Sequence, residues 1–349
     1  VRRMESFEFE LLLGDPAQIY VIDTRVYDRL TANPVDYGSA LSLSTVFLVM
    51  VFPLMLYQWH LLKRGERYVV ITGKGFATRV TDIGRWKYVT LAMVLVYFAL
   101  AVAIPVGSLI LGTFMKVPGL FNVAEPYTTE HFGLTFADTI VIGSIKNTFI
   151  VAFISATLGM VLYAVMSYIN MRTRFAGRSI LEFFSWLPYS VPSIVMGLGF
   201  LWAFVGGIRL PFAPYGSLQL LTLVFLVKGM PLGVRVMNGS MIQMGRDLEE
   251  SSRISGASPL RTFSKITAPL MRPAFLSAWM ILFSLVIRDV ASVILLYGPK
   301  SRVISVLMLE YWNTWLTGRA SVLALIMLGI TLIGVTVASV LGLRRPAVL

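Results

Sequence analysis

The sequence predicts an all-α fold, a polytopic membrane helix bundle with about seven transmembrane helices. Hydrophobic residues make up 56% of the 349 residues and charged residues only 14%, whereas a soluble domain usually carries about 25% charged residues. The mean hydropathy is +0.76, and the apolar residues gather in long runs. Together these observations exclude an ordinary soluble globular protein.

Each of the apolar runs is close to the roughly 20 residues that a helix needs to cross the hydrocarbon core. Helices are expected because lipid offers no partner to exposed backbone groups, and no run alternates as a barrel strand does. The fifth run is interrupted by Lys228, Gly229 and Pro231. The expected spans are residues 41–62, 88–111, 148–168, 181–205, 218–234, 274–296 and 320–343.

The basic residues indicate the orientation of these spans. Lysine and arginine gather in residues 61–87, 169–180 and 235–272, whereas acidic residues are frequent in residues 1–40. Because basic loops face the cytoplasm, we expect the N-terminus outside and the C-terminus in the cytoplasm, as an odd number of spans requires. This topology, with attraction to anionic membrane lipid, accounts for the net charge of +12 better than nucleic-acid binding does.

Few residues here are suited to catalysis or to metal binding. The chain has two histidines, His60 and His131, and no cysteine, which excludes most His/Cys metal sites, Fe–S clusters and thiol nucleophiles. The stretch Gly73-Lys74-Gly75 lacks the upstream glycine spacing of a phosphate-binding loop. We therefore expect no catalytic residue, no bound metal and no ATP hydrolysis on this chain.

The two ends of the chain resemble each other. The run LLLGDPAQIYVI (residues 11–22) parallels LLYGPKSRVISV (residues 295–306), and Tyr27 and Gly38 correspond to Tyr311 and Gly318. Both following spans end in basic pairs, Lys63-Arg64 and Arg344-Arg345. Chance similarity is the alternative to a true repeat. A true repeat would make residues 1–64 a periplasmic segment plus the last transmembrane helix of an incomplete first unit, 65–85 a cytoplasmic linker, and 86–349 a complete six-helix unit.

A polar segment, residues 241–273, separates the fifth and sixth spans and has the local pattern of a helical hairpin. Asp247 can cap a helix that has Glu249 and Glu250 in its first turn. Gly256 can end this helix in a left-handed conformation, and Ser258-Pro259 can start a second helix that Pro269 and Pro273 end. From this pattern alone, an amphipathic hairpin that only lies on lipid is an equal alternative.

The spacing within this segment adds a resemblance. Glu250, Ser251 and Ser252 precede Gly256 by the interval found in the EAA motif of bacterial ABC-importer permeases, and Ile266 and Pro269 follow at the family's spacing. Serines replace both alanines of the motif, and Ala268 stands where leucine is usual. The stretches LPYSVPSIVMGLG (residues 187–199) and VIRDVASVILLYGP (residues 286–299) resemble the C-terminal half of fused permeases for ferric iron.

The resemblance implies a permease subunit of a bacterial inner membrane. A separate cytoplasmic ATPase dimer would bind ATP and Mg²⁺ and accept the EAA loop in a groove, and a periplasmic binding protein would deliver ferric iron. One loop cannot serve two ATPases, so we expect a second permease half or a second copy, or a fragment of a longer chain. The implied ATPase-coupling residues are Glu250, Ser251, Ser252, Gly256, Ala257, Ile266 and Pro269.

Ionisable residues and helix breaks within the spans suggest a translocation path. Placing a charged side chain inside a membrane costs free energy, so Lys228, Arg288 and Asp289 are expected to have a function. The alternative is an interhelical ion pair that only fixes the packing of the spans. We expect Pro188 and Pro192 to break the fourth span, and Pro231 and Gly233 to break the fifth. The alternative is that these residues only kink the helices. The path candidates are Tyr189, Ser190, Lys228, Arg288 and Asp289.

A secondary transporter, a channel and a passive membrane scaffold are the alternatives to a permease subunit. A secondary transporter or channel would need no ATPase-docking loop, and a passive scaffold would not explain broken helices that carry charges. Polyamine, thiamine and phosphonate permeases share the motif, so each is an alternative to ferric iron as the cargo.

Overall fold

The computed structural model describes residues 7–65, 84–117, 119–122, 125–207, 212, 214–244 and 247–343. Helices connected by turns dominate this part of the chain, and it contains no β-strand. The elements are α1 (Phe7–Phe9), η2 (Glu10–Gly14), η3 (Asp15–Ala17), α2 (Ile22–Thr31), α3 (Tyr37–Gly65), α4 (Trp86–Phe98), η5 (Ala99–Ala103), α5 (Ile104–Phe114), α6 (Glu130–Ala137), α7 (Thr139–Arg172), α8 (Arg178–Trp186), η6 (Leu187–Ser190), α9 (Ser193–Val205), α10 (Leu218–Gln243), α11 (Asp247–Ile254), α12 (Pro259–Thr262), η7 (Phe263–Thr267), α13 (Ala268–Arg288), α14 (Ile304–Asn313) and α15 (Thr317–Leu343).

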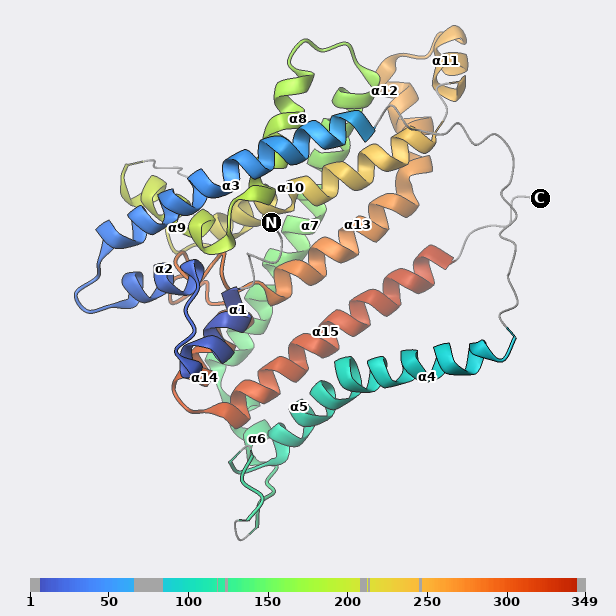
Figure 1. Cartoon of the computed structure of the whole chain (residues 1–349). Coiled ribbons are helices and arrows are strands. Elements are labelled where there is room, and N and C mark those ends of the chain that lie inside the picture. The colour runs from blue at the N-terminus through green and yellow to red at the C-terminus, as the bar shows by residue number, and fades with distance from the viewer. Residues whose placement is uncertain are drawn as a thin grey trace.

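The predicted membrane bundle is confirmed. Among the described residues, six helices are long and apolar enough to cross a membrane, and a bent pair provides a seventh span if it is counted as one. The long helices α3, α10, α13 and α15 have roughly parallel axes, and α13 runs antiparallel to the other three (Figure 1). The short helices α8, α11 and α12 lie at one end of the bundle, and α6 lies at the opposite end.

The bent pair is the fourth predicted span. Residues Arg178–Ser190 and Ser193–Val205 meet at an angle of 112°, so the predicted break at Pro188 and Pro192 is confirmed. Pro192 has an extended ψ of 145° and directly precedes α9, as expected because proline cannot donate to a continuing helix. The first turns of α9, Ser193–Leu198, are buried. The beginning of this helix therefore lies inside the bundle, whereas Trp202 and Val205 near its end are exposed.

Two apolar cores hold the chain together. The larger one is formed by α7, α10, α13, α14 and α15. The smaller one joins the N-terminal segment to the broken span and to the turn after α13. Its buried members are Phe7, Val26, Leu30, Ala40, Ile194, Val195, Leu198 and Ala291. Through these residues the N-terminal segment packs against α9, and α2 and α9 are neighbours in Figure 1.

The expectation that Pro231 and Gly233 break the fifth span is wrong, because α10 runs from Leu218 to Gln243 without interruption. The side chain of Tyr163 on α7 lies against this region and is 1% exposed. Its hydroxyl donates to the carbonyl oxygen of Leu226, at a distance of 2.5 Å. A Cβ atom at Gly233 would overlap Cδ2 of the Tyr163 ring. The glycine therefore makes room for the ring of Tyr163 instead of ending the helix.

The expected helix end at Pro269 and Pro273 is also wrong. The segment Leu260–Arg288 forms one candidate span, in which the π-helical turn η7 leads directly into α13. Pro269 falls in the first turn of α13, where a missing N–H group is tolerated. The second helix of the loop is consequently continuous with the sixth span.

The sixth span ends earlier than residue 296, and this is a further correction. Helix α13 ends at Arg288, and Asp289 leaves the helix with ψ of 122°. Its Oδ1 atom accepts a hydrogen bond from the Ser292 backbone N–H at 3.0 Å, and its carbonyl oxygen accepts one from the Ser305 hydroxyl at 2.8 Å. Local side-chain bonds of this kind compete with the helix, so residues 289–303 form turns.

Some predictions concern residues outside the described part of the chain. Most of the expected linker 65–85, with Gly73-Lys74-Gly75, falls between residues 65 and 84, and the basic pair Arg344-Arg345 follows the last described residue.

We predict that Gly233→Ala lowers the thermal stability of the protein in detergent. The added Cβ would collide with the buried Tyr163 ring, and overpacking of this kind costs about 1–3 kcal/mol. The matched control is Gly239→Ala on the same helix, where a Cβ would meet nothing within 4 Å. Thermal unfolding of both variants is the measurement. Equal midpoints for Gly233→Ala and Gly239→Ala would contradict the role of the glycine.

Candidate functional site

The predicted hairpin between the fifth and sixth spans is present. Helix α11 ends at Ile254, and Gly256 follows with φ of +83°, a left-handed conformation that favours glycine. The N–H of Gly256 donates to the Arg253 carbonyl at 2.9 Å, and the N–H of Ala257 donates to the Ser252 carbonyl at 3.1 Å. These bonds complete the C-terminal cap of α11 and turn the chain toward α12.

A polar contact closes the hairpin. The hydroxyls of Ser252 and Thr262 lie 3.0 Å apart and share a hydrogen bond between α11 and α12. The backbone N–H of Arg261 donates to the Ser258 hydroxyl at 3.3 Å, which matches the predicted cap at the start of the second helix. Serine at position 252, where the family usually has alanine, therefore has a structural use here.

The outer surface of the hairpin carries apolar side chains and charges of both signs. Leu248, Ile254 and Leu260 are 55%, 88% and 77% exposed. The exposed charged residues of the hairpin include Asp247, Glu250, Arg253, Arg261 and Lys265. This surface lies at the end of the bundle that carries α8 (Figure 1), and it faces away from both apolar cores.

The predicted coupling residues divide between the two sides of the hairpin. Three of them are exposed, namely Glu250, Ser251 and Gly256. The remaining four are half-buried and contribute to the inner side, namely Ser252, Ala257, Ile266 and Pro269.

Sequence reasoning missed the carboxylate that faces inward, which is Glu249. Its side chain is 9% exposed and forms an ion pair with Arg172, which is 7% exposed, at 3.1 Å between Oε1 and Nε. The Thr267 hydroxyl donates to the same Oε1 atom at 3.1 Å. No sequence spacing relates Arg172 to Glu249, so only the fold brings them together.

A second charged cluster lies inside the bundle, where the prediction placed its ionisable residues. The Nζ of Lys228 on α10 donates to the Asp289 carboxylate, to the Ser193 hydroxyl at 2.5 Å and to the Ser292 hydroxyl at 2.9 Å. Asp289 is 9% exposed and the Lys228 side chain 25% exposed. The cluster thus joins α10 to the first residue of α9 and to the turn after α13.

The N-terminal segment contributes a further carboxyl group to this neighbourhood. Glu8 follows Phe7, which packs in the smaller core beside Ala291. Burial raises the pKa of the Glu8 carboxyl, the Asp289 carboxylate raises it further, and Lys228 opposes this shift. Glu8 is therefore part of the electrostatic surroundings of the ion pair, and the sequence offered no signal for it.

The other path candidates do not join this cluster. Ser190 is 8% exposed at the end of η6, and the Tyr189 ring packs edge-on against Trp186 with centroids 6.3 Å apart. Arg288 is exposed although Asp289 beside it is buried.

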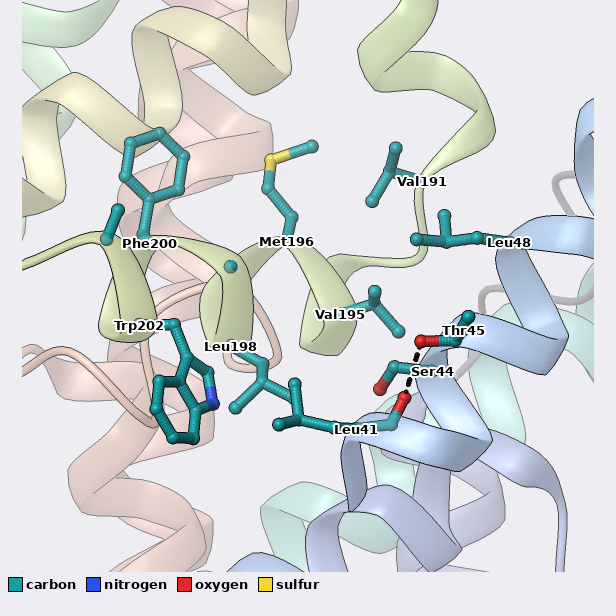
Figure 2. A pocket seen from close by; sticks show the side chains of 12 residues that line it. Leu41, Ser44, Thr45, Leu48, Val191, Val195, Met196, Leu198, Phe200 and Trp202 are labelled. Carbon is teal, nitrogen blue, oxygen red and sulfur yellow. Dashed lines mark hydrogen bonds between the residues drawn. The ribbon is translucent and has the colours of Figure 1, made fainter. Parts of the chain in front are cut away.

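An apolar cavity of about 450 Å³ separates α3 from α9. Figure 2 shows Leu41, Ser44, Thr45 and Leu48 of α3 facing Val195 and Leu198 of α9. The hydroxyls of Ser44 and Thr45 donate to carbonyl oxygens of their own helix, each at 2.8 Å. No charged residue lines the cavity, so it is unsuited to an ionic cargo, and it contains none of the predicted path residues.

Comparison with known proteins shows which transport proteins this chain resembles. A family model described as the inner membrane component of binding-protein-dependent transport systems matches residues 155–345. A ferric transport system permease protein, FbpB, of Actinobacillus pleuropneumoniae is 27% identical over 307 residues, which cover 87% of this chain and 43% of that protein. The chain therefore spans less than half the length of this relative.

A shorter relative and a solved structure extend the comparison. A molybdate/tungstate transport system permease protein, WtpB, of Pyrococcus abyssi is 25% identical over 199 residues, which cover 57% of this chain and 77% of that protein. The crystal structure of a bacterial ABC transporter that imports the acidic polysaccharide alginate matches with a TM-score of 0.58 at 18% identity, covering 74% of this chain and 95% of that chain. The two chains therefore share a fold.

We predict that Lys228→Met destabilises the protein strongly, because the Asp289 carboxylate is left buried without its cation. Loss of one partner of a buried pair costs about 3–5 kcal/mol. The control is Lys116→Met, since Lys116 pairs with Glu125 where both side chains are exposed, 46% and 86%, and such pairs contribute about 0–1 kcal/mol. Thermal unfolding in detergent compares the two. The pair would be unimportant for stability if both variants unfolded at the wild-type temperature.

Proposed function

This chain belongs to the family of inner membrane components of binding-protein-dependent transport systems, and from this membership we propose that its hairpin couples an ATPase to transport. The chain is a transport component rather than an enzyme. In the proposal, ATP and Mg²⁺ bind to a cytoplasmic ATPase dimer, a periplasmic protein delivers the cargo, and the hairpin of residues 241–273 is the docking element.

The observation that carries this proposal is the shape of the hairpin. It turns at Gly256, where φ is +83° and a Cβ atom would meet nothing within 4 Å, so its tip can approach another protein closely. Its apolar side chains Leu248, Ile254 and Leu260 face outward. Exposed apolar side chains surrounded by charged residues are typical of a protein-binding surface.

We place the translocation path beside the Lys228–Asp289 pair. Charged groups inside a membrane line substrate routes or pair with each other, and broken helices near such groups are common in transporters. Here Ser193, the first residue of the broken-off helix α9, contacts Lys228 directly. The exposed Arg288, and Tyr189 with Ser190 at the break, are further candidates along the same route.

Ferric iron is the cargo we propose, on the similarity to the ferric permease, which covers 87% of this chain. The molybdate/tungstate relative covers 57%, and it makes an oxyanion the second candidate. Selection between them would then depend mainly on the binding protein.

Residues 1–64 are proposed to be the end of a first permease unit, joined by the linker 65–85 to a complete unit of residues 86–349. Helices α2 and α14 have the same length of 10 residues, and each precedes a long apolar helix, α3 or α15. A second permease half or a second copy would complete the pair of docking loops. In this proposal the N-terminus is periplasmic, the C-terminus is cytoplasmic, and the outer helices contact lipid.

We predict that Gly256→Asp abolishes the stimulation of ATP hydrolysis by loaded binding protein, with a loss of roughly tenfold or more. A side chain at this tip is strained and blocks close docking. The matched control is Gly119→Asp in the loop between α5 and α6, at the opposite end, where glycine has φ of +86° and equally open surroundings. Stimulation is measured in proteoliposomes that also contain the cognate ATPase and the binding protein.

The same assay separates mechanism from cargo. Stimulation by ferric iron that Gly256→Asp removes and Gly119→Asp preserves supports both proposals. Stimulation by molybdate or putrescine but not by iron keeps the mechanism and rejects the cargo. Equal stimulation in the wild type and in Gly256→Asp would contradict the assignment of the hairpin.

A further inference from the structure

A buried ion pair attaches the inner side of the hairpin to the bundle, and the proposed docking surface does not include it. Arg172 is the last residue of α7. Its Nε atom donates to Glu249 of α11 at 3.1 Å, and its Nη2 atom donates to the carbonyl oxygens of Met241 at 3.0 Å and Met244 at 2.8 Å. One guanidinium thereby joins the ends of α7 and α10 to α11.

Glu249 extends this connection to the sixth span. The carboxylate oxygen that accepts from Arg172 also accepts from the Thr267 hydroxyl, and Thr267 is the residue immediately before α13. Beside this bond, the rings of Tyr168 on α7 and Phe263 pack edge-on, with centroids 5.0 Å apart. Three spans, α7, α10 and α13, therefore converge on a single buried ion pair at the base of the hairpin.

The chemistry of the pair makes this connection rigid. The last carbonyl groups of a helix have no partner within the helix, and a cation at that end is favoured by the helix dipole. The planar guanidinium reaches both carbonyls and the carboxylate together, which a lysine ammonium cannot reproduce with the same geometry. Both charged side chains are almost fully buried, so separating them leaves an unpaired charge away from water.

We propose that the Arg172–Glu249 pair is the joint through which displacement of the hairpin moves α7, α10 and α13. This inference rests on the function proposed above, because the displacement comes from the docked ATPase. Arg172 and Glu249 are positioning residues. They contact neither ATP nor cargo, and they act by keeping the outer surface of the hairpin fixed to the bundle. Closely packed interiors transmit displacement only where such contacts are maintained.

The test uses Arg172→Lys, which retains the positive charge and loses the planar group. We expect ATP hydrolysis to continue while the cargo imported per ATP hydrolysed falls roughly tenfold. Glu249→Gln, which keeps an acceptor for Thr267 but removes the charge, should act in the same direction. The matched control is Arg174→Lys, an exposed arginine in the same connection between α7 and α8, and it should leave the ratio unchanged.

A second measurement reports the joint itself. The chain has no cysteine, so paired spin labels can be introduced at Leu162→Cys on the exposed face of α7 and at Ser255→Cys at the end of α11. Both positions are exposed. We expect a narrow distance distribution in the otherwise unchanged protein and in Arg174→Lys, and a broader one in Arg172→Lys.

Each outcome decides the proposal. A broader distribution together with a lower import ratio supports it. An unchanged ratio of cargo imported to ATP hydrolysed in Arg172→Lys, even with lower thermal stability, would mean that the pair only stabilises the fold. An unchanged distance distribution between the spin labels would show that the pair is not the joint. Wild-type protein that imports no cargo on ATP hydrolysis would overturn the proposed function, and this inference with it. That failure is recognised in the wild type before any variant is compared.

Discussion

A backbone group that leaves a helix inside a bilayer must find a partner within the protein, and the interruptions of this bundle follow that constraint. Within the continuous helix α10, the Tyr163 hydroxyl adds a hydrogen bond to the Leu226 carbonyl, upstream of Pro231. The Asp289 side chain and the Ser305 hydroxyl take backbone groups at the end of α13. Because these side chains come from other helices or from the break itself, the interruptions fix how the spans pack and do not loosen them.

Buried charges then connect the spans at two levels. Inside the bundle, Lys228 and Asp289 join α10 to α9 and to the turn after α13. At the end that carries the hairpin, Arg172 and Glu249 join α7, α10 and α11. Helix α10 takes part in both connections, through Lys228 and through the carbonyl of Met241. A change in the position of this helix would consequently displace residues of both clusters, since neither ion pair can separate without leaving a charge unpaired.

Much of this arrangement could be predicted from local sequence. Apolar length indicated the spans, and the spacing around Gly256 and Ser258-Pro259 indicated the hairpin. Several of the failures involve partners that are distant along the chain. Pro231 does not break α10, and the neighbouring Gly229 and Gly233 instead make room for Tyr163 of α7. Glu249 and Glu250 are adjacent carboxylates in a short helix, and only the position of Arg172 decides which one faces inward. Glu8 comes within electrostatic reach of the ion pair through tertiary packing alone.

The N-terminal segment packs against α9, and this contact indicates a role for α9. Phe7, Val26 and Leu30 share a core with Ile194, Val195 and Leu198 of α9. If residues 1–64 are the end of a first permease unit, α9 lies on the boundary between the two units. Transporters built from repeats carry substrate between the repeats, along interrupted helices. Ser193 opens α9 and contacts Lys228, so the ion pair lies on that boundary, where rearrangement of one unit against the other would expose or cover it.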